Sequence, residues 1–102
     1  MLSSKERANL RKYANSQDTI IHIGKDGVTE NVIRQADSAL TARELIKGRV
    51  LPNSLLTARE ASDEVAQAVS AETVFTVGSK FVLFRRNRAK KDSEYKAFGS
   101  FS

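Results

Sequence analysis

The stretch GKDGVTENVI, from Gly24 to Ile33, joins two elements of different kinds. The preceding residues, Thr19 to Ile23, are mostly β-branched and predict a strand. Thr29 is a favourable N-cap for a helix that follows it, so two glycines stand between a strand and a helix. Both Gly24 and Gly27 can adopt positive φ and leave the backbone open to a ligand. Because the unpaired N–H groups at the start of a helix attract anions, we predict that this loop binds a phosphate group.

Along the chain, capping signals and hydrophobic periodicity predict three helices and four strands. Ser3 with Glu6, and Thr57 with Glu60, have the spacing of a capping box, in which each side chain bonds the backbone of the other residue. A glycine at position 78 suits the tight connection of a hairpin. The predicted helices are 3–15, 29–43 and 57–69, and the predicted strands are 19–23, 44–51, 72–77 and 81–85.

The order αβαβαββ predicts one compact α/β domain, in which a small mixed four-stranded sheet is packed with three helices. The closing hairpin should be antiparallel, and both β–α–β connections should be right-handed. We assign residues 1–86 to the domain and expect residues 87–102 to form a basic, flexible tail. In the third helix, the predicted core-facing stripe is Ala61, Val65, Ala68 and Val69.

Positive charge is concentrated at the C-terminal end of this 102-residue chain, whose formal net charge is +5. Residues 85–102 hold six Lys or Arg and two Asp or Glu, a net of +4, and residues 1–84 supply the remaining +1. A basic segment favours a polyanion as partner, although it is equally consistent with a solvated tail. Lys47 and Arg49 share one face of the strand predicted at 44–51. They either line a groove for a phosphate chain or cover a helix with their aliphatic stems.

Several classes of function have no support in the sequence. The chain has no cysteine and one histidine, His22, so a disulfide is excluded and a structural zinc site nearly so. It has neither a Gly-rich phosphate loop ending in Gly-Lys-Ser/Thr nor a G-x-S-x-G turn, so we expect neither an enzyme nor a cofactor. His22 should point to the face opposite Ile21 and Ile23, as a structural or surface residue. Without an apolar run of about 18 residues or an apolar N-terminal signal, we expect a cytoplasmic protein without a membrane partner.

The run IIHIGKDGVTENVIRQADSALTARELIKGRV resembles the core of the CRS1-YhbY, or CRM, RNA-binding domain. LSSKERANLRKYAN and VFTVGSKFVLFRR are similar to the first helix and the final hairpin of that domain. The resemblance covers residues 2–86 in the family's order and spacing, and the size of the chain resembles the free-standing bacterial YhbY-type proteins. Two positions depart from the pattern. Gly48 stands where a branched apolar residue is usual, which can permit a bulge, and Asp26 replaces the more typical Asn.

The resemblance implies a fold similar to the C-terminal domain of a bacterial translation initiation factor. It also implies that the G-x-x-G loop, by likeness to KH domains, contacts RNA. The bacterial members of the family are associated with precursors of the large ribosomal subunit, so the resemblance implies ribosomal RNA or a pre-ribosomal particle as partner.

Together these observations predict an RNA-binding protein. Lys25 would contact phosphate by charge, while Gly24 and Gly27 let the RNA backbone come close. Since no array of aromatic side chains is available for stacking, structured RNA recognised by shape is favoured. The alternative is a protein-binding adaptor that docks an acidic partner through its basic tail, and a nuclease is disfavoured by the missing catalytic groups. The predicted RNA-binding residues are Gly24, Lys25, Asp26, Gly27, Lys47, Arg49, Arg85, Arg86 and Arg88.

Overall fold

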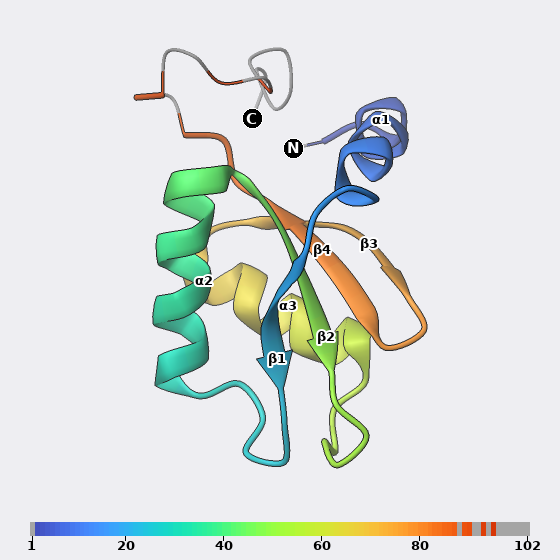
Figure 1. The fold of residues 1–102 in the computed structure, drawn as a ribbon, viewed down its shortest axis with the longest axis vertical. Helices are drawn as coiled ribbons and strands as arrows, with labels where there is room; N and C mark the ends of the chain where they lie inside the picture. The colour runs from blue at the N-terminus through green and yellow to red at the C-terminus, as the bar shows by residue number, and fades with distance from the viewer. Residues whose placement is uncertain (1, 88, 91–92, 94, 96–102) are drawn as a thin grey trace.

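The order of helices and strands in a computed structural model of the chain is αβαβαββ, which confirms the prediction (Figure 1). The structure describes residues 2–87, 89–90, 93 and 95. Each predicted N-cap is confirmed, because Ser3, Thr29 and Thr57 accept a hydrogen bond from the backbone N–H three residues on. The elements are α1 (Ser4–Ala14), β1 (Thr19–Ile23), α2 (Glu30–Arg43), β2 (Leu45–Val50), α3 (Ala58–Val69), β3 (Glu72–Val77) and β4 (Lys80–Phe84).

The four strands form one mixed sheet in the order β1-β2-β4-β3. β1 and β2 are parallel, and β4 runs antiparallel to both of its neighbours, as the closing hairpin requires. Helices α2 and α3 cover one face of the sheet, whereas α1 covers only the upper part of the other face (Figure 1). The rest of that second face is therefore left without a helix. None of the described helices is long and apolar enough to cross a membrane.

Two apolar clusters hold these layers together. The larger cluster lies between the sheet and α2 and α3, and the smaller one joins the sheet to α1 through Leu10, Leu45 and Val82. The prediction for Ala68 is wrong, because Ala68 is exposed and Ala66 is buried instead. The stripe that α3 buries is Ala58, Ala61, Ser62, Val65, Ala66 and Val69, a strict three-and-four spacing that Ala68 does not fit.

Gly48 is required by the aromatic ring opposite it. Gly48 pairs with Phe81 across β2 and β4, and a Cβ at position 48 would lie 2.5 Å from Cε2 and 2.8 Å from Cε1 of that ring. Any larger residue would therefore overlap Phe81, whose side chain is fully buried. The neighbouring β1–β2 register shifts between Thr19 and Ile21, so an irregularity of the kind that Gly48 suggested is present beside it.

Glu44 anchors the chain beyond β4. Its backbone has a φ of +67°, and its carboxylate is fully buried between α2 and β2. The carboxylate accepts hydrogen bonds from Nη1 of Arg86 (2.7 Å), the backbone N–H of Asn87 (2.9 Å) and the hydroxyl of Ser93 (2.5 Å). The ring of Tyr95 packs edge-on against Phe84, with centroids 5.7 Å apart. Several described residues of the segment 87–102, namely Asn87, Ser93 and Tyr95, are therefore in contact with the domain.

Candidate nucleic-acid interface

The Gly24–Gly27 loop is a tight turn with its two central side chains in solvent. The backbone N–H of Gly27 donates to the carbonyl of Gly24 at 3.1 Å, and Lys25 and Asp26 are exposed at the tip. Gly27 has a φ of +70°, which only glycine adopts without strain. Gly24 does not have a positive φ, so the expectation that both glycines use this freedom holds for Gly27 alone. A Cβ at Gly24 would meet its neighbours at 3.8 Å or more, so nothing in the fold demands a glycine there.

The start of α2 lies immediately beside this turn. The hydroxyl of Thr29 accepts from the backbone N–H of Val32 at 3.2 Å, which leaves the N–H groups of Glu30 and Asn31 without an acceptor inside the helix. These groups carry the partial positive charge of the helix N-terminus. The turn and the helix start together have the donors that a phosphate group accepts from.

Three chain segments meet at this end of the sheet, which is the lower end in Figure 1. The backbone N–H of Leu51, just after β2, donates to the carbonyl of Ile23 at 2.8 Å. The N–H of Val50 donates to Ser79 in the β3–β4 turn at 2.7 Å. The glycine turn is therefore held next to the ends of β2 and of the hairpin.

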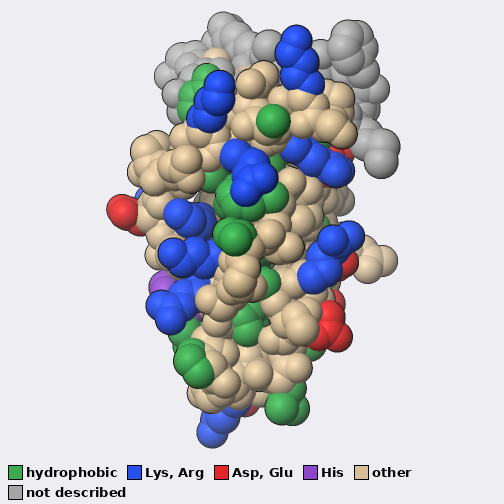
Figure 2. Space-filling view, turned by 90° about the vertical axis from the view of Figure 1, so that its right-hand side faces the viewer, with side chains coloured by type: hydrophobic (Ala, Val, Ile, Leu, Met, Phe, Trp, Pro, Cys, Tyr) green, Lys and Arg blue, Asp and Glu red, His purple; other side chains and the backbone are tan. Residues whose placement is uncertain are grey.

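A row of basic side chains crosses three strands of the sheet close to that end. In the strand register His22 on β1 lies opposite Arg49 on β2, and Arg49 lies opposite Lys80 on β4. Residues directly opposite each other in a sheet share a face. This is the face away from α2 and α3, because Ile21 and Ile23 point the other way into the larger cluster. All three side chains of the row are exposed. Figure 2 shows Lys and Arg side chains gathered beside the histidine.

Lys47, the other basic residue of β2, is placed differently from Arg49. Its side chain is half-buried and its Nζ lies 3.5 Å from the carbonyl of Ala14, at the C-terminal end of α1. Of the two roles left open for this strand face, Lys47 therefore covers the end of a helix. Arg49 remains free in solvent.

Arg85 is used inside the fold. Its Nη1 donates to Oδ1 of Asp37 (2.7 Å) and to the carbonyl of Val69 (2.8 Å), and its Nη2 donates to the carbonyl of Asp37 and to the hydroxyl of Thr41. Only 22% of the side chain is exposed. Arg85 thereby ties α2 to the last turn of α3, and its terminal nitrogens have little capacity left for a phosphate.

The other predicted basic residues near the C-terminus do not join the glycine turn either. Arg86 pairs with the buried carboxylate of Glu44 and donates to the carbonyl of Asn87. Both Arg85 and Arg86 follow the end of β4 that lies away from Lys80, so the length of the sheet separates them from Lys25. Arg88 lies outside the described residues.

One charge of the C-terminal segment, that of Lys90, lies at the C-terminal end of α2. The ammonium of Lys90 donates to the backbone carbonyl of Ala42 at 2.8 Å. The side-chain amide of Asn87 donates to the backbone carbonyl of Thr41. Cations are favourable there because the end of a helix carries partial negative charge. Lys90, one of the basic residues counted in the C-terminal segment, is therefore bound to the end of α2.

The pKa of Glu44 departs clearly from its ordinary value. Burial on its own would raise the pKa of Glu44. The hydrogen bonds from Ser93, from the backbone of Asn87 and from Arg86, together with the charge of Arg86, outweigh burial and hold the pKa below its ordinary value. Glu44 is therefore a buried carboxylate with a structural role, far from the glycine turn.

Sequence reasoning missed Lys80 and gave His22 no role in binding. Both belong to the basic row only because of the strand register, which pairs residues 27 and 31 positions away from Arg49. The alternation of β1 did predict the exposed face of His22, and the structure confirms it.

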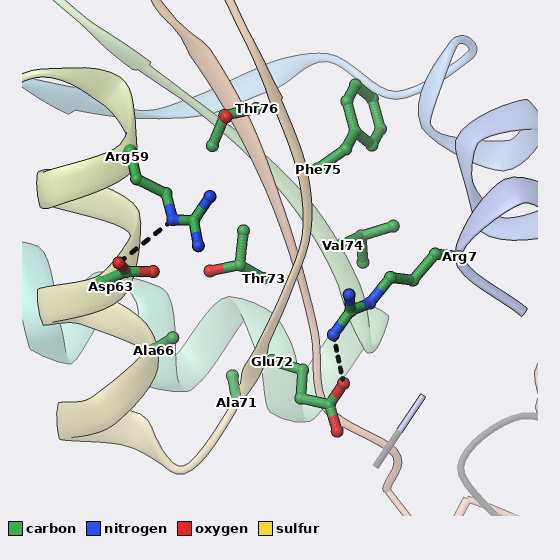
Figure 3. A pocket seen from close by; sticks show the side chains of 10 residues that line it. All are labelled: Arg7, Arg59, Asp63, Ala66, Ala71, Glu72, Thr73, Val74, Phe75 and Thr76. Carbon is green, nitrogen blue, oxygen red and sulfur yellow. Dashed lines mark hydrogen bonds and ion pairs between the residues drawn. The ribbon is translucent and has the colours of Figure 1, made fainter. Parts of the chain in front are cut away.

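A groove along the edge strand β3 lacks the unpaired positive charge that binding of a polyanion needs. It has a volume of about 360 Å³ and lies between α1 and α3 (Figure 3). Arg59 there pairs with Asp63 at 3.2 Å, and Arg7 lies 3.7 Å from Glu72, so each cation has an acidic neighbour. The described residues also contain no cluster of His, Asp and Glu that could hold a metal ion.

Comparisons with known proteins agree with this architecture. The chain is 34% identical over 94 residues to "Probable RNA-binding protein YqeI" of Bacillus subtilis, which covers 92% of this chain and 98% of that protein. It is 29% identical over 90 residues to a Haemophilus influenzae protein named "RNA-binding protein", covering 88% and 91%. These relatives are named for binding and not for catalysis.

A solved structure has the same fold. It is the solution structure of the hypothetical protein SAV1595 from Staphylococcus aureus, described in its title as "a putative RNA binding protein". The TM-score is 0.76 at 38% identity, over 92% of this chain and 96% of that one. The CRS1/YhbY (CRM) domain pattern matches residues 2–85. Because the family pattern matches residues 2–85 of the 102, this chain is a member of the CRS1/YhbY (CRM) domain family.

Proposed function

We propose that this protein binds RNA through the glycine turn and the basic row beside it, and that it acts in assembly of the large ribosomal subunit in the cytoplasm. The names of its relatives support RNA as the partner. The ribosomal role is the one implied by the resemblance to free-standing bacterial members of the family.

The observation that carries the proposal is the register of Arg49 and Lys80. Within the part of the chain that the structure describes, neither side chain has an acidic partner, and the same holds for Lys25 at the turn. By contrast, the arginines Arg34 and Arg59 on α2 and α3 are paired with acids one turn away. Unpaired cations on the part of the sheet face that α1 leaves uncovered favour a polyanion there.

The binding surface that we propose differs from the set of residues predicted by sequence. It keeps Gly24, Lys25, Gly27 and Arg49 and adds Lys80. Asp26 lies at the tip of the turn, where its charge opposes a phosphate. Arg85 and Arg86 are left out because their donors bind other parts of the chain.

The test is binding of a folded fragment of large-subunit ribosomal RNA, measured by fluorescence anisotropy over a range of salt concentrations. The variant combines Lys25→Ala, Arg49→Ala and Lys80→Ala. If each residue neutralises one phosphate, the slope of log affinity against log salt should fall by about 0.9 for each residue removed. An unchanged slope would contradict the proposed surface.

The control is Arg34→Ala with Arg59→Ala, which removes two exposed positive charges from the helical face, whereas the variant removes three from the proposed surface. It should leave the slope near that of the wild-type protein. A slope that falls by the same amount per charge removed in the variant and in the control would show that net charge, and not this surface, determines binding. Absence of affinity at low ionic strength would exclude RNA as the partner. For the ribosomal role, RNA crosslinked to the protein in cells should be enriched in precursors of the large subunit.

A further inference from the structure

A small pocket opens between the glycine turn and the segment that follows β2. Its volume is about 320 Å³, and its walls come from the turn itself, from His22 and Val32, and from Thr29 and Asn53. The sequence brings these residues from β1, from the start of α2 and from the β2–α3 connection. The pocket therefore exists only in the folded chain.

Besides Lys25, which suits a phosphate, the pocket is lined by side chains of a different kind. The lining residues include His22, which carries a flat imidazole ring, and Val32, which carries a branched apolar side chain. The exposed carboxamide of Asn53 offers both a donor and an acceptor. A phosphate group needs cations and N–H donors, which Lys25 and the start of α2 supply. A planar heterocycle with a hydrogen-bonding edge matches the interior better.

Two of these side chains are free to meet a ligand. Within the described residues, neither His22 nor Asn53 makes a side-chain hydrogen bond or an ion pair. Asn53 lies over Gly24, with its Oδ1 3.9 Å from where a Cβ would stand. Gly24 therefore leaves open a wall of the pocket that a side chain would narrow.

We propose that this pocket takes one unpaired nucleobase of the bound RNA, stacked on His22 and hydrogen-bonded by Asn53 through its edge. The inference rests on the proposed function, since it places the neighbouring phosphate at Lys25 and the turn. A base inside a continuous duplex is stacked on both sides and its pairing edge is occupied, so it does not enter. The RNA recognised is then a structured RNA with a loop or bulge at the contact, and not a duplex alone.

The experiment compares two RNAs with the same number of phosphates, a hairpin with an unpaired loop and a blunt duplex. Affinities are measured by fluorescence anisotropy at one salt concentration. The wild-type protein should bind the hairpin about tenfold more tightly, the size of effect that stacking one base produces. Asn53→Ala should reduce that preference and leave the affinity for the duplex unchanged. The matched control is Asn15→Ala, an exposed asparagine at the end of α1, which should keep the preference.

A second measurement follows the side-chain amide of Asn53 by NMR as nucleoside monophosphates or ribose 5-phosphate are added. The nucleotides should shift the Asn53 signal, and the sugar phosphate should not. Equal shifts from both would show a phosphate site and overturn the inference.

The two proposals fail in different ways. Equal affinity for hairpin and duplex, unaffected by Asn53→Ala, would exclude a base in this pocket. The proposed function would still stand if Arg49→Ala and Lys80→Ala weakened binding of both RNAs. Absence of binding to either RNA would overturn both proposals.

Discussion

Arg49 on β2 and Lys80 on β4 stand directly opposite each other on the uncovered face of the sheet, and both are exposed. Like charges in such a pair destabilise a sheet slightly. No acidic side chain of the described chain compensates them. An anion that lies across the two strands would remove this repulsion between Arg49 and Lys80 and so stabilise the sheet. The pair is therefore central to the proposed RNA surface.

This relationship predicts opposite effects on folding and on binding. Lys80→Glu places a carboxylate opposite Arg49, so the free energy of unfolding should rise by about 0.5 kcal/mol. RNA affinity should fall, because a cation of the surface is replaced by an anion. Urea unfolding and anisotropy measure the two effects. A loss of stability together with affinity would mean that Lys80 is needed for folding instead.

The Gly48–Phe81 contact predicts a strong constraint at position 48. Gly48→Val should lower the free energy of unfolding by about 1–3 kcal/mol, since the side chain overlaps the ring. Adding Phe81→Leu should recover part of that loss, so the double variant should be more stable than additivity of the single changes predicts. Strictly additive urea-unfolding data would contradict the contact.

The two glycines of the turn should respond differently to alanine. Gly27→Ala puts a Cβ on a residue with a φ of +70°, and should cost about 1–2 kcal/mol of stability. Gly24→Ala meets only ordinary contacts and should leave the melting temperature unchanged. It should nevertheless weaken RNA binding, because the added methyl group holds the RNA away from the backbone. Full RNA affinity in Gly24→Ala would remove close backbone approach from the proposal.

Glu44 predicts how stability depends on pH. The pKa of Glu44 is lowered in the folded state, so the folded protein binds fewer protons there than the unfolded chain does. Its contribution is complete above the ordinary pKa of 4.5 and is lost as the pH falls through the lower folded value. Glu44→Gln should cost about 2 kcal/mol at neutral pH. The difference in unfolding free energy between the wild-type protein and the variant should shrink in acid, and a constant difference would contradict the shift.

Arg85 should affect stability and not the salt dependence of RNA binding. Arg85→Ala removes hydrogen bonds to α2 and to the end of α3, and should cost about 2 kcal/mol of unfolding free energy. The slope of log affinity against log salt should equal that of the wild-type protein, measured where both are folded. A lower slope would return Arg85 to the RNA surface.

Local signals explain why so much of the fold was predictable. The capping boxes at Ser3 and Thr57 act between residues three positions apart, so they are readable without any knowledge of tertiary contacts. The N-cap at Thr29 and the β-branched run of β1 are equally local. They were sufficient to place the glycine turn between a strand and a helix, and hence to identify it as a candidate phosphate site.

The sequence by itself thus determined the helices, the strands, their order and the position of the turn, because those follow from propensities and contacts within a few residues. Tertiary structure alone decided which cations are free. Arg85 meets Asp37 from 48 positions away, and Lys80 reaches Arg49 only through the pairing of β2 with β4. Composition counts charges without their partners, and pairing between distant segments decides whether each charge faces solvent or is neutralised inside the fold.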